Sequence, residues 1–333
     1  MQKIKWGVLG AAHIATAQVI PAMQRGEMCE IAGIASRDLA KAQKAARDLG
    51  IPRAYGSYEE MLADPAIEAV YNPLPNHLHA PWSIRAAEAG KHVLCEKPIA
   101  MSVAETRELM AARDRTGVVM GEAFMVRTHP QWLRIAELVR GGRIGQLRYV
   151  LGSFAYFKLD AANIRNIREY GGGAVMDIGC YPITVSRMVF GEEPVRVSAS
   201  VVRDPALGNI DMLTSAILEY PSGPCVFTCS TQSISNQSMR FYGTKGSVEP
   251  EIPFNAPPDQ PARIRIHDGR ANGAGVTTEE FPACDQYTIQ GDLFSRAIRE
   301  GGKPPVPLED ALKNMAVIEA VFRSGETGRW ERP

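Results

Sequence analysis

The sequence lacks the features that mark membrane proteins, secreted proteins and nucleic-acid-binding proteins. No apolar stretch approaches the roughly 20 residues that span a bilayer, and the start MQKIKWGVLGAAHIA has no charged leader followed by an apolar run and a cleavage site. Lys plus Arg and Asp plus Glu each total 37, so the zero net charge gives no general attraction to nucleic acid or anionic membranes. We therefore expect a cytoplasmic protein that binds neither nucleic acid nor a membrane.

Paired cysteines and metal-ligand clusters are missing as well. None of the 6 cysteines forms a C-x-x-C pair, which favours reduced, mostly buried thiols. None of the 6 histidines has the spacing of a metal site, because even His77 and His79 are two residues apart and do not converge on one helix face. We therefore expect no metal site.

The first third of the chain alternates short apolar runs with helical patterns. At roughly 150 residues per domain, the length of 333 residues predicts two domains. Strands are expected at 3–9, 30–35, 67–72, 92–95 and 118–120, and helices at 13–25, 38–48, 80–89 and 103–115. Short strands separated by helices predict a doubly wound α/β domain with a parallel sheet over residues 1–122.

The pattern changes after about residue 122. Strands joined by Gly or Pro turns are expected at 147–157, 194–203, 212–220, 224–232, 238–250 and 262–267. Helices are expected at 130–140, 174–188, 289–300 and 308–325, and a Pro-rich loop at 252–262. This pattern predicts a second α/β domain over residues 123–333, with a large, mainly antiparallel open sheet.

A glycine-containing turn follows the first expected strand and opens the first helix. Residues 10–15 (GAAHIA) match the dinucleotide-binding pattern G-x-G-x-x-[GA], except that Ala12 replaces the second glycine. Gly10 would make the tight turn, and the amide groups of the helix start would face a pyrophosphate. The degenerate match alone is equally typical of an ordinary strand-to-helix turn, but its place in a β-α-β pattern favours a Rossmann dinucleotide site.

The end of the second expected strand favours NADP(H) over NAD(H). An NAD site usually has Asp or Glu here to bind the ribose hydroxyls, whereas this chain has Ser36 and Arg37. Ser36 can donate a hydrogen bond to a 2′-phosphate, and Arg37 and Lys41 can pair with its charge. The alternatives are a solvated basic edge without a role, or a site in which Asp38 turns towards the ribose of NAD(H).

A Lys-Pro pair follows the fourth apolar run. Loops at the carboxyl ends of parallel strands face the ligand crevice, and Pro98 biases Lys97 towards an extended backbone that helps to hold it in one direction. A partly desolvated lysine can donate to a substrate oxygen or lower the pKa of a neighbouring group. The alternative is a surface ion pair between Glu96 and Lys97.

A second cluster lies in the segment 171–182 (GGGAVMDIGCYP). Its three glycines indicate a backbone that passes close to another group, and Asp177 and Tyr181 are four residues apart, hence on one helix face. Hydride transfer to a carbonyl needs a proton donor at its oxygen, which a tyrosine with a lowered pKa can supply. Together with Lys97 these residues would form a proton-transfer set. The alternative is an ordinary helix start with a half-buried tyrosine.

Taken together, these segments resemble the Gfo/Idh/MocA oxidoreductase family over nearly the whole chain. The matching pieces are the turn at 10–15, Asn72-Pro73 with Asn76-His77, Glu96-Lys97-Pro98, the segment 171–181, and 328–330 (GRW) with its preceding helix. The resemblance implies an N-terminal Rossmann domain and a C-terminal domain whose open sheet is often used for dimer or tetramer contacts.

The tyrosine at position 181 resembles one branch of that family, whereas many members carry histidine there. The branch includes glucose–fructose oxidoreductase, dimeric dihydrodiol dehydrogenase and NADP-dependent xylose dehydrogenases. It implies Tyr181 as the catalytic acid/base, Lys97 as its partner, Asp177 as a substrate-orienting group and NADP(H) as the cofactor. We accordingly expect cofactor contacts from Gly10, Ala12, His13, Ile14, Ser36, Arg37, Lys41, Asn72, Pro73, Leu74, Asn76, His77, Glu96, Lys97 and Arg165.

Two of these assignments keep an alternative. His77 is as well suited to a structural role in its turn as to a cofactor contact, and Arg165 suits the substrate as well as the cofactor. The preferred function is an NADP(H)-dependent oxidoreductase that transfers a hydride between the nicotinamide and a sugar or related polyhydroxylated compound, as a homodimer or homotetramer. A trans-dihydrodiol or other carbonyl reductase, or a non-catalytic NADP(H)-sensing protein, are the alternative functions.

The expected phosphate pocket leads to a first prediction. Arg37→Ala should weaken the binding of NADPH much more than that of NADH, because only NADPH carries the 2′-phosphate that the guanidinium would bind. Fluorescence titration of both cofactors measures the two dissociation constants. Equal weakening of both would contradict the assignment of Arg37 to the phosphate.

Overall fold

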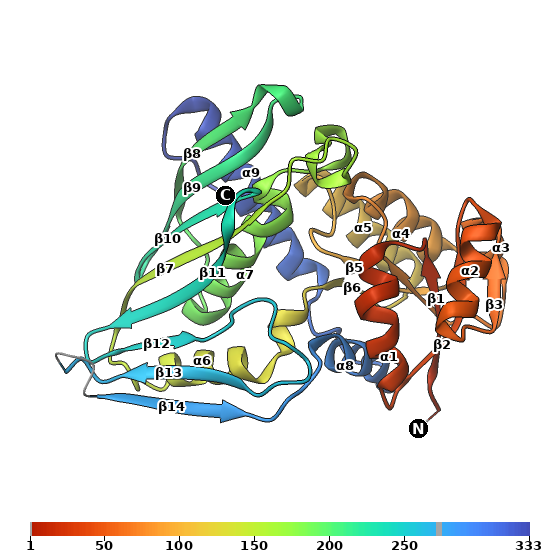
Figure 1. The fold of residues 1–333 in the computed structure, drawn as a ribbon, viewed down its shortest axis with the longest axis horizontal. Helices are drawn as coiled ribbons and strands as arrows, with labels where there is room; N and C mark the ends of the chain where they lie inside the picture. The colour runs from red at the N-terminus through yellow and green to blue at the C-terminus, as the bar shows by residue number, and fades with distance from the viewer. Residues whose placement is uncertain (1, 271–274) are drawn as a thin grey trace. The chain divides into compact units, whose positions relative to one another are not determined.

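The computed structural model describes residues 2–270 and 275–333, which divide into two compact units (Figure 1). The first unit contains the chain up to Met125 together with Asp285–Leu312. The second contains Val126–Cys284 together with Lys313–Pro333. The predicted domain boundary at residue 122 therefore leaves out residues 285–312, which belong to the first unit.

The first unit is built on a parallel sheet of six strands. Their order across the sheet is β3-β2-β1-β4-β5-β6, and every neighbouring pair is parallel. The strands are β1 (Ile4–Leu9), β2 (Cys29–Ala35), β3 (Arg53–Tyr55), β4 (Ala69–Asn72), β5 (His92–Glu96) and β6 (Met120–Ala123). This confirms the doubly wound Rossmann fold. The sequence pattern missed β3, which has three residues and no apolar run.

Helices cover both faces of this sheet, which is why its strands are apolar on both sides. One face carries α1 (Ile20–Arg25), α2 (Leu39–Leu49) and α8 (Gln286–Glu300), and the other carries α3 (Tyr58–Ala63), α4 (His79–Glu88) and α5 (Val103–Thr116). On the first face, the buried ring of Trp6 lies 5.6 Å from that of Phe294, and its indole N–H donates to Ser295 Oγ at 3.1 Å. These contacts attach α8 to the N-terminal strands.

The second unit is built on a mixed sheet of eight strands in the order β14-β13-β12-β11-β7-β10-β9-β8. All pairs are antiparallel except β7 with β10. The strands are β7 (Leu147–Phe157), β8 (Arg196–Asp204), β9 (Ile210–Tyr220), β10 (Gly223–Ser230), β11 (Gln232–Gly243), β12 (Ser247–Pro250), β13 (Ala262–His267) and β14 (Val276–Phe281). The expectation of a large, mainly antiparallel sheet is confirmed.

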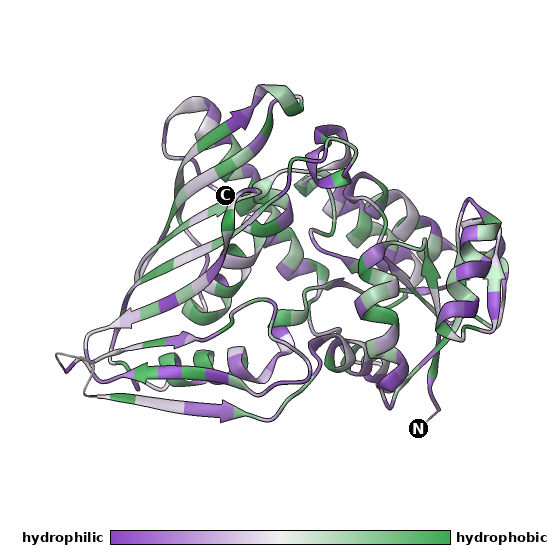
Figure 2. Cartoon of the chain, viewed as in Figure 1, coloured by the Kyte–Doolittle hydropathy of each residue, from purple (hydrophilic) through white to green (hydrophobic). Residues whose placement is uncertain are grey.

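The two faces of this sheet differ. Helices α6 (Pro130–Arg140), α7 (Cys180–Phe190) and the part of α9 (Leu308–Thr327) that belongs to this unit pack on one face. On the other face, Tyr149, Leu151, Ile217 and Val226 are exposed. Hydrophobic and hydrophilic residues accordingly alternate along strands such as β13, as Figure 2 shows.

One sequence expectation about strands was wrong in the second unit, and one strand was not predicted. The run 238–250 is two strands, β11 and β12, because Gly243 and Gly246 turn the chain between them. The Cβ of a larger residue at either glycine would lie 2.1 Å or less from a backbone carbonyl oxygen. Strand β14 (VTTEEF) was not expected, because its mostly exposed, polar residues pair only along one edge of the sheet.

The packing of α8 on the N-terminal sheet can be tested by mutation. Phe294→Ala should lower the free energy of unfolding by about 3 to 5 kcal/mol, because it leaves a cavity beside Trp6. Leu293→Ala is the matched control on the same helix, since Leu293 is 40% exposed and should lose about 1 kcal/mol or less. Urea unfolding measures both, and equal losses would contradict this view of the core.

Candidate functional site

In the first unit, the predicted cofactor residues follow the carboxyl ends of four neighbouring parallel strands. The carboxyl ends of parallel strands lie at one edge of a sheet, and that edge is where ligands bind in open α/β folds. The residues concerned are Gly10, Ala12, His13 and Ile14 after β1, Ser36, Arg37 and Lys41 after β2, Asn72, Pro73, Leu74, Asn76 and His77 around the end of β4, and Glu96 and Lys97 at the end of β5.

The turn after β1 fits a dinucleotide pyrophosphate. Gly10 has a φ of +90°, and a Cβ there would lie 3.0 Å from the Leu74 side chain, so both the conformation and the space favour glycine. The chain then enters a π-helical turn (Ala15–Val19) that leads into α1. Ile14, at its start, has no polar side chain to cap the turn. The backbone N–H groups of this helix start are therefore suited to an anion.

Two charged side chains follow β2: Asp38, whose carboxylate caps the next helix, and Arg37, which is exposed. Asp38 caps α2, since its Oδ1 accepts a hydrogen bond from the Lys41 backbone N–H at 3.2 Å. Ser36 Oγ accepts from the Asp38 backbone N–H, also at 3.2 Å. Arg37 is exposed. Burial raises the pKa of Tyr58, and the nearby Arg37 charge opposes that rise only in part. Tyr58 had no signal in the sequence that linked it to this edge.

The loop after β4 is shaped from the inside by Asn72. Its fully buried side chain donates to the His79 backbone oxygen at 3.1 Å and to Ser83 Oγ at 3.0 Å, and accepts from the Leu74 N–H at 3.3 Å. A cofactor contact of Asn72 would therefore come from its backbone rather than its side chain. Asn76 and His77 are half-buried in the short 3-10 turn that follows.

His79 connects this loop with the Lys97-Pro98 loop. The imidazole is 1% exposed, with Nδ1 2.8 Å from the Pro98 oxygen and Nε2 2.6 Å from the Leu74 oxygen. Burial lowers the pKa of His79 to about 4, so the ring is neutral near pH 7 and its single N–H donates to one carbonyl at a time. Sequence reasoning considered His79 only as a metal ligand and missed this contact.

Glu96 and Lys97 stand at the end of β5. One Glu96 carboxylate oxygen accepts from the buried Tyr71 hydroxyl at 2.6 Å, and the other accepts from the Lys97 backbone N–H at 3.3 Å. Burial and the Glu96 charge raise the pKa of Tyr71 well above its ordinary value, so Tyr71 remains a donor. Glu122, at the end of β6, accepts from the Ile99 N–H at 2.9 Å, which holds the chain just after Pro98.

In the second unit, the Asp177 carboxylate is the centre of a polar cluster. Its Oδ2 accepts from the Tyr156 hydroxyl at 2.6 Å and from Arg165 Nε at 3.1 Å. Burial and the Asp177 charge raise the pKa of Tyr156 far above its usual value, and Asp177 raises the pKa of Arg165. Tyr156 therefore acts as a donor. The structure places Arg165 on Asp177, while its expected contact with the cofactor stays a prediction.

Tyr181 is the residue after the start of α7 and is packed among aromatic rings. Its ring lies 5.3 Å from that of Phe154, edge to face, and 5.2 Å from that of Phe254. Phe154 and Phe254 stack on each other at 4.8 Å. The ring of Tyr181 is thus fixed by large apolar neighbours.

The three glycines before this helix pass close to two groups. A Cβ at Gly172 would lie 2.4 Å from the Arg165 backbone oxygen. A Cβ at Gly173, where φ is +106°, would lie 1.9 Å from Asp211 Oδ1. The glycine run therefore brings the Arg165 loop and a buried carboxylate against the start of the helix, and Asp211 is a site residue that the sequence analysis missed.

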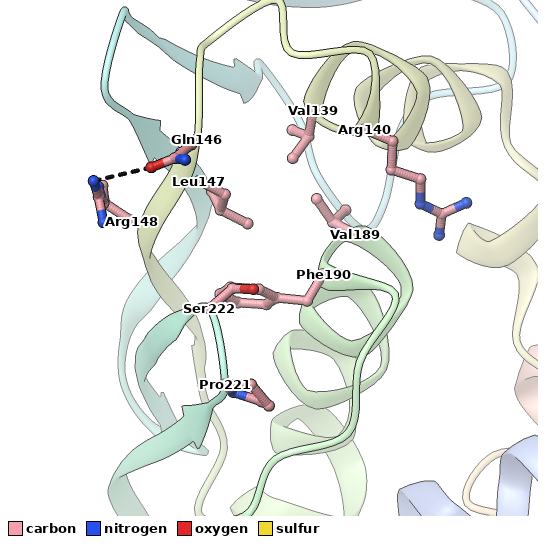
Figure 3. A pocket seen from close by; sticks show the side chains of 9 residues that line it. All are labelled: Val139, Arg140, Gln146, Leu147, Arg148, Val189, Phe190, Pro221 and Ser222. Atoms are coloured by element: carbon pink, nitrogen blue, oxygen red, sulfur yellow. Dashed lines mark hydrogen bonds between the residues drawn. The ribbon is translucent and has the colours of Figure 1, made fainter.

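A separate surface pocket of about 440 Å³ lies in the second unit (Figure 3). Its apolar lining includes Val139, Leu147, Val189 and Phe190, while Arg148 points away and donates to Gln146 Oε1 at 3.0 Å. None of the predicted site residues lines it. Among the described residues, no helix is long and apolar enough to cross a membrane, and no group of three or more His, Cys, Asp or Glu could hold a metal ion.

The contact of His79 with both loops yields a prediction. His79→Gln should weaken NADPH binding at least about tenfold, because a glutamine cannot reproduce both carbonyl contacts and the two loops lose their connection. His92→Gln is the control, since His92 accepts from the Val119 N–H at the amino end of β5 and should affect stability alone. Fluorescence titration and thermal unfolding separate the effects, and unchanged NADPH affinity in His79→Gln would contradict the proposed connection.

Comparison with known proteins identifies the family. Residues 4–124 match the oxidoreductase family with an NAD-binding Rossmann fold, and residues 132–249 match the GFO/IDH/MocA C-terminal domain. The chain is 48% identical to an uncharacterised oxidoreductase of Rhizobium meliloti, over 99% of both chains. It is 41% identical to D-xylose 1-dehydrogenase (NADP(+)) 2 of Haloferax volcanii, over 97% of this chain and 98% of that protein. The solved aldose–aldose oxidoreductase from Caulobacter crescentus, complexed with glycerol, superposes with a TM-score of 0.90 over 100% of both chains, at 29% identity. The chain therefore belongs to the GFO/IDH/MocA oxidoreductase family.

Proposed function

We propose that this oxidoreductase is an NADP(H)-dependent aldose dehydrogenase or reductase, with Lys97, Tyr181 and Asp177 as its catalytic residues. The Asp177 cluster is the observation that carries the proposal. A carboxylate held by a tyrosine hydroxyl and an arginine is a charged acceptor of the kind that binds a sugar hydroxyl. Such a polar cluster suits a polyhydroxylated substrate better than an apolar carbonyl compound.

The preference for NADP(H) rests on the end of β2. Asp38, the carboxylate that could serve an NAD ribose, is engaged as the cap of α2. Arg37 and Lys41 are exposed there, and Ser36 provides a hydroxyl, which together suit a 2′-phosphate. The NADP(+) named for the D-xylose dehydrogenase of Haloferax volcanii supports the same preference.

The proposed roles follow from the chemistry of the side chains. When bound, NADP⁺ would supply the acceptor for a hydride from the carbinol carbon. Tyr181 takes the proton of the substrate hydroxyl in oxidation, and returns it to the carbonyl oxygen in reduction. The Lys97 ammonium donates a hydrogen bond to the substrate oxygen. Asp177 accepts from a neighbouring substrate hydroxyl and so orients the ring.

Assembly into a homodimer or homotetramer belongs to the same proposal. The outer face of the eight-stranded sheet supports it, because Tyr149, Leu151, Ile217 and Val226 are exposed there on neighbouring strands. Exposed apolar residues of this kind favour association with another surface.

The experiment that tests the function titrates the protein with NADPH and NADH, and then follows absorbance of the NADP⁺ form with a panel of aldoses. We expect tight NADPH binding and reduction of NADP⁺ that depends on the sugar. Tight binding without turnover of any sugar would contradict the aldose proposal and favour a non-sugar carbonyl substrate or a sensor.

Variants test the residue assignments in the same assay. Lys97→Ala and Tyr181→Phe should lower kcat by about 100-fold or more and change NADPH affinity far less, because they remove proton transfer rather than cofactor contacts. Lys313→Ala is the matched control for the lysine on the surface and should keep full activity. A Tyr181→Phe enzyme with unchanged kcat would refute the catalytic role of the tyrosine.

A further inference from the structure

Asp211 is a buried carboxylate near the start of β9, and it lies against the start of the helix that carries Asp177 and Tyr181. It is 3% exposed, and its Oδ2 accepts a hydrogen bond from the Val175 N–H at 2.8 Å. Its other oxygen fills the space beside Gly173, where a Cβ would lie only 1.9 Å away. Asp211 is therefore an acceptor at the helix start, with one oxygen on the Val175 N–H and the other against Gly173.

The helix start needs such an acceptor because its own sequence supplies none. The first turn is the π-helical turn Val175–Gly179, and its preceding residue, Ala174, has no side chain that can accept a hydrogen bond. Asp177 lies two residues after Val175, and Tyr181 lies six residues after it. A shift at the helix start therefore moves both side chains.

We propose that Asp211 is a positioning residue for the reaction, whose buried carboxylate fixes the helix start and thereby the directions of Asp177 and Tyr181. The inference rests on the proposed function for the roles of these two residues. Asp211 lies behind the helix backbone and acts through it, so it needs no contact with the substrate.

Three neighbouring strands place charged or titratable side chains near the Asp211 carboxylate. On β8, Arg203 is its antiparallel partner, and this guanidinium also donates to the Asn209 oxygen and pairs with Glu326 at 3.6 Å. On β7, Tyr156 faces both Asp211 and Asp177, and on β10 the buried Cys229 thiol is near. Among the described residues, no buried cation lies beside the Asp211 carboxylate to compensate for its loss of solvation.

Its surroundings make Asp211 responsive to pH near neutrality. Burial raises the pKa of Asp211 to about 6, although the backbone N–H bonds and the Arg203 charge lower it. Above that pH the ionised carboxylate accepts from the Val175 N–H, and below it a proton occupies one of the carboxylate oxygens. We therefore expect kcat to fall as the pH drops through about 6.

Stability should respond in the opposite direction, which separates positioning from a purely structural role. A carboxyl group with a raised pKa in the folded state stabilises the fold at low pH and loses that contribution as the pH rises from about 4 to about 6. The ionised form of Asp211 thus fixes the helix start but lowers the free energy of unfolding. Asp211→Asn removes the buried charge, so it should unfold no more easily than the natural protein at pH 8.

The experiment compares Asp211→Asn, Asp211→Ala and a control, Asp285→Asn, in the full chain. Asp285 caps α8 by accepting from the Tyr287 N–H at 2.9 Å, so the control makes the same change at another helix start. Hydrogen exchange of the segment 172–182 is followed between about pH 5 and 8, corrected for intrinsic exchange rates. kcat and KM are measured over the same range with NADP⁺ and an aldose that is turned over.

We expect exchange in 172–182 to rise about tenfold below pH 6 in the natural protein and in Asp285→Asn, and to be high at every pH in both Asp211 variants. kcat should lose its acidic limb near pH 6 in Asp211→Asn and be lowered about tenfold at pH 8, with KM for NADP⁺ within about twofold. Natural exchange in the Asp211 variants, or an acidic limb that persists in Asp211→Asn, would overturn the proposal.

Hydrogen exchange and kinetics test this inference and the proposed function separately. The exchange measurement needs no substrate, so a protein that turns over no aldose would contradict the proposed function while the exchange data still decide whether Asp211 fixes the helix. If Asp211→Ala does not fold, Asp211→Asn alone decides, because it keeps one acceptor oxygen and loses only the charge and the second acceptor.

Discussion

Parallel pairing of β1, β2, β4 and β5 is the constraint on which the chemistry of the first unit depends. Parallel hydrogen bonding makes these strands end at one edge, so four loops that are far apart in sequence meet there. Buried side chains then fix the shapes of these loops. Asn72 forms hydrogen bonds within the loop after β4, and His79 connects that loop with the loop that holds Lys97. The exposed Arg37, in contrast, is available to an anion.

In the second unit, the proposed catalytic residues Asp177 and Tyr181 lie on a helical segment rather than at strand ends. That helix begins without a side-chain cap of its own, and a carboxylate from β9 replaces the cap. Only glycine leaves room for the carboxylate beside position 173. Asp211, Gly173 and the helix start at Val175 therefore contact one another. We expect a substitution of Asp211 or Gly173 to displace Asp177 and Tyr181.

The family assignment and the local geometry support the function at different levels. Membership in the GFO/IDH/MocA family, with 41% identity to a D-xylose dehydrogenase, supports oxidoreductase chemistry on a hydroxylated carbon compound. One fold hosts many substrates, so fold alone does not select one. The hydrogen bonds of Asp177 with Tyr156 and Arg165 add the local argument for a polyol or sugar.

The sequence by itself determined the fold class, most strands and helices, and the segments that carry Gly10, Lys97, Asp177 and Tyr181, because periodicity and glycine motifs are local signals. It missed β3 and β14, which lack an apolar run, and the return of residues 285–312 to the first unit, which depends on contacts such as Trp6 with Phe294. Only the tertiary structure showed which groups His79 and Asp211 contact. Each acts on groups 5 to 36 residues away, through burial and hydrogen bonds that no local pattern encodes.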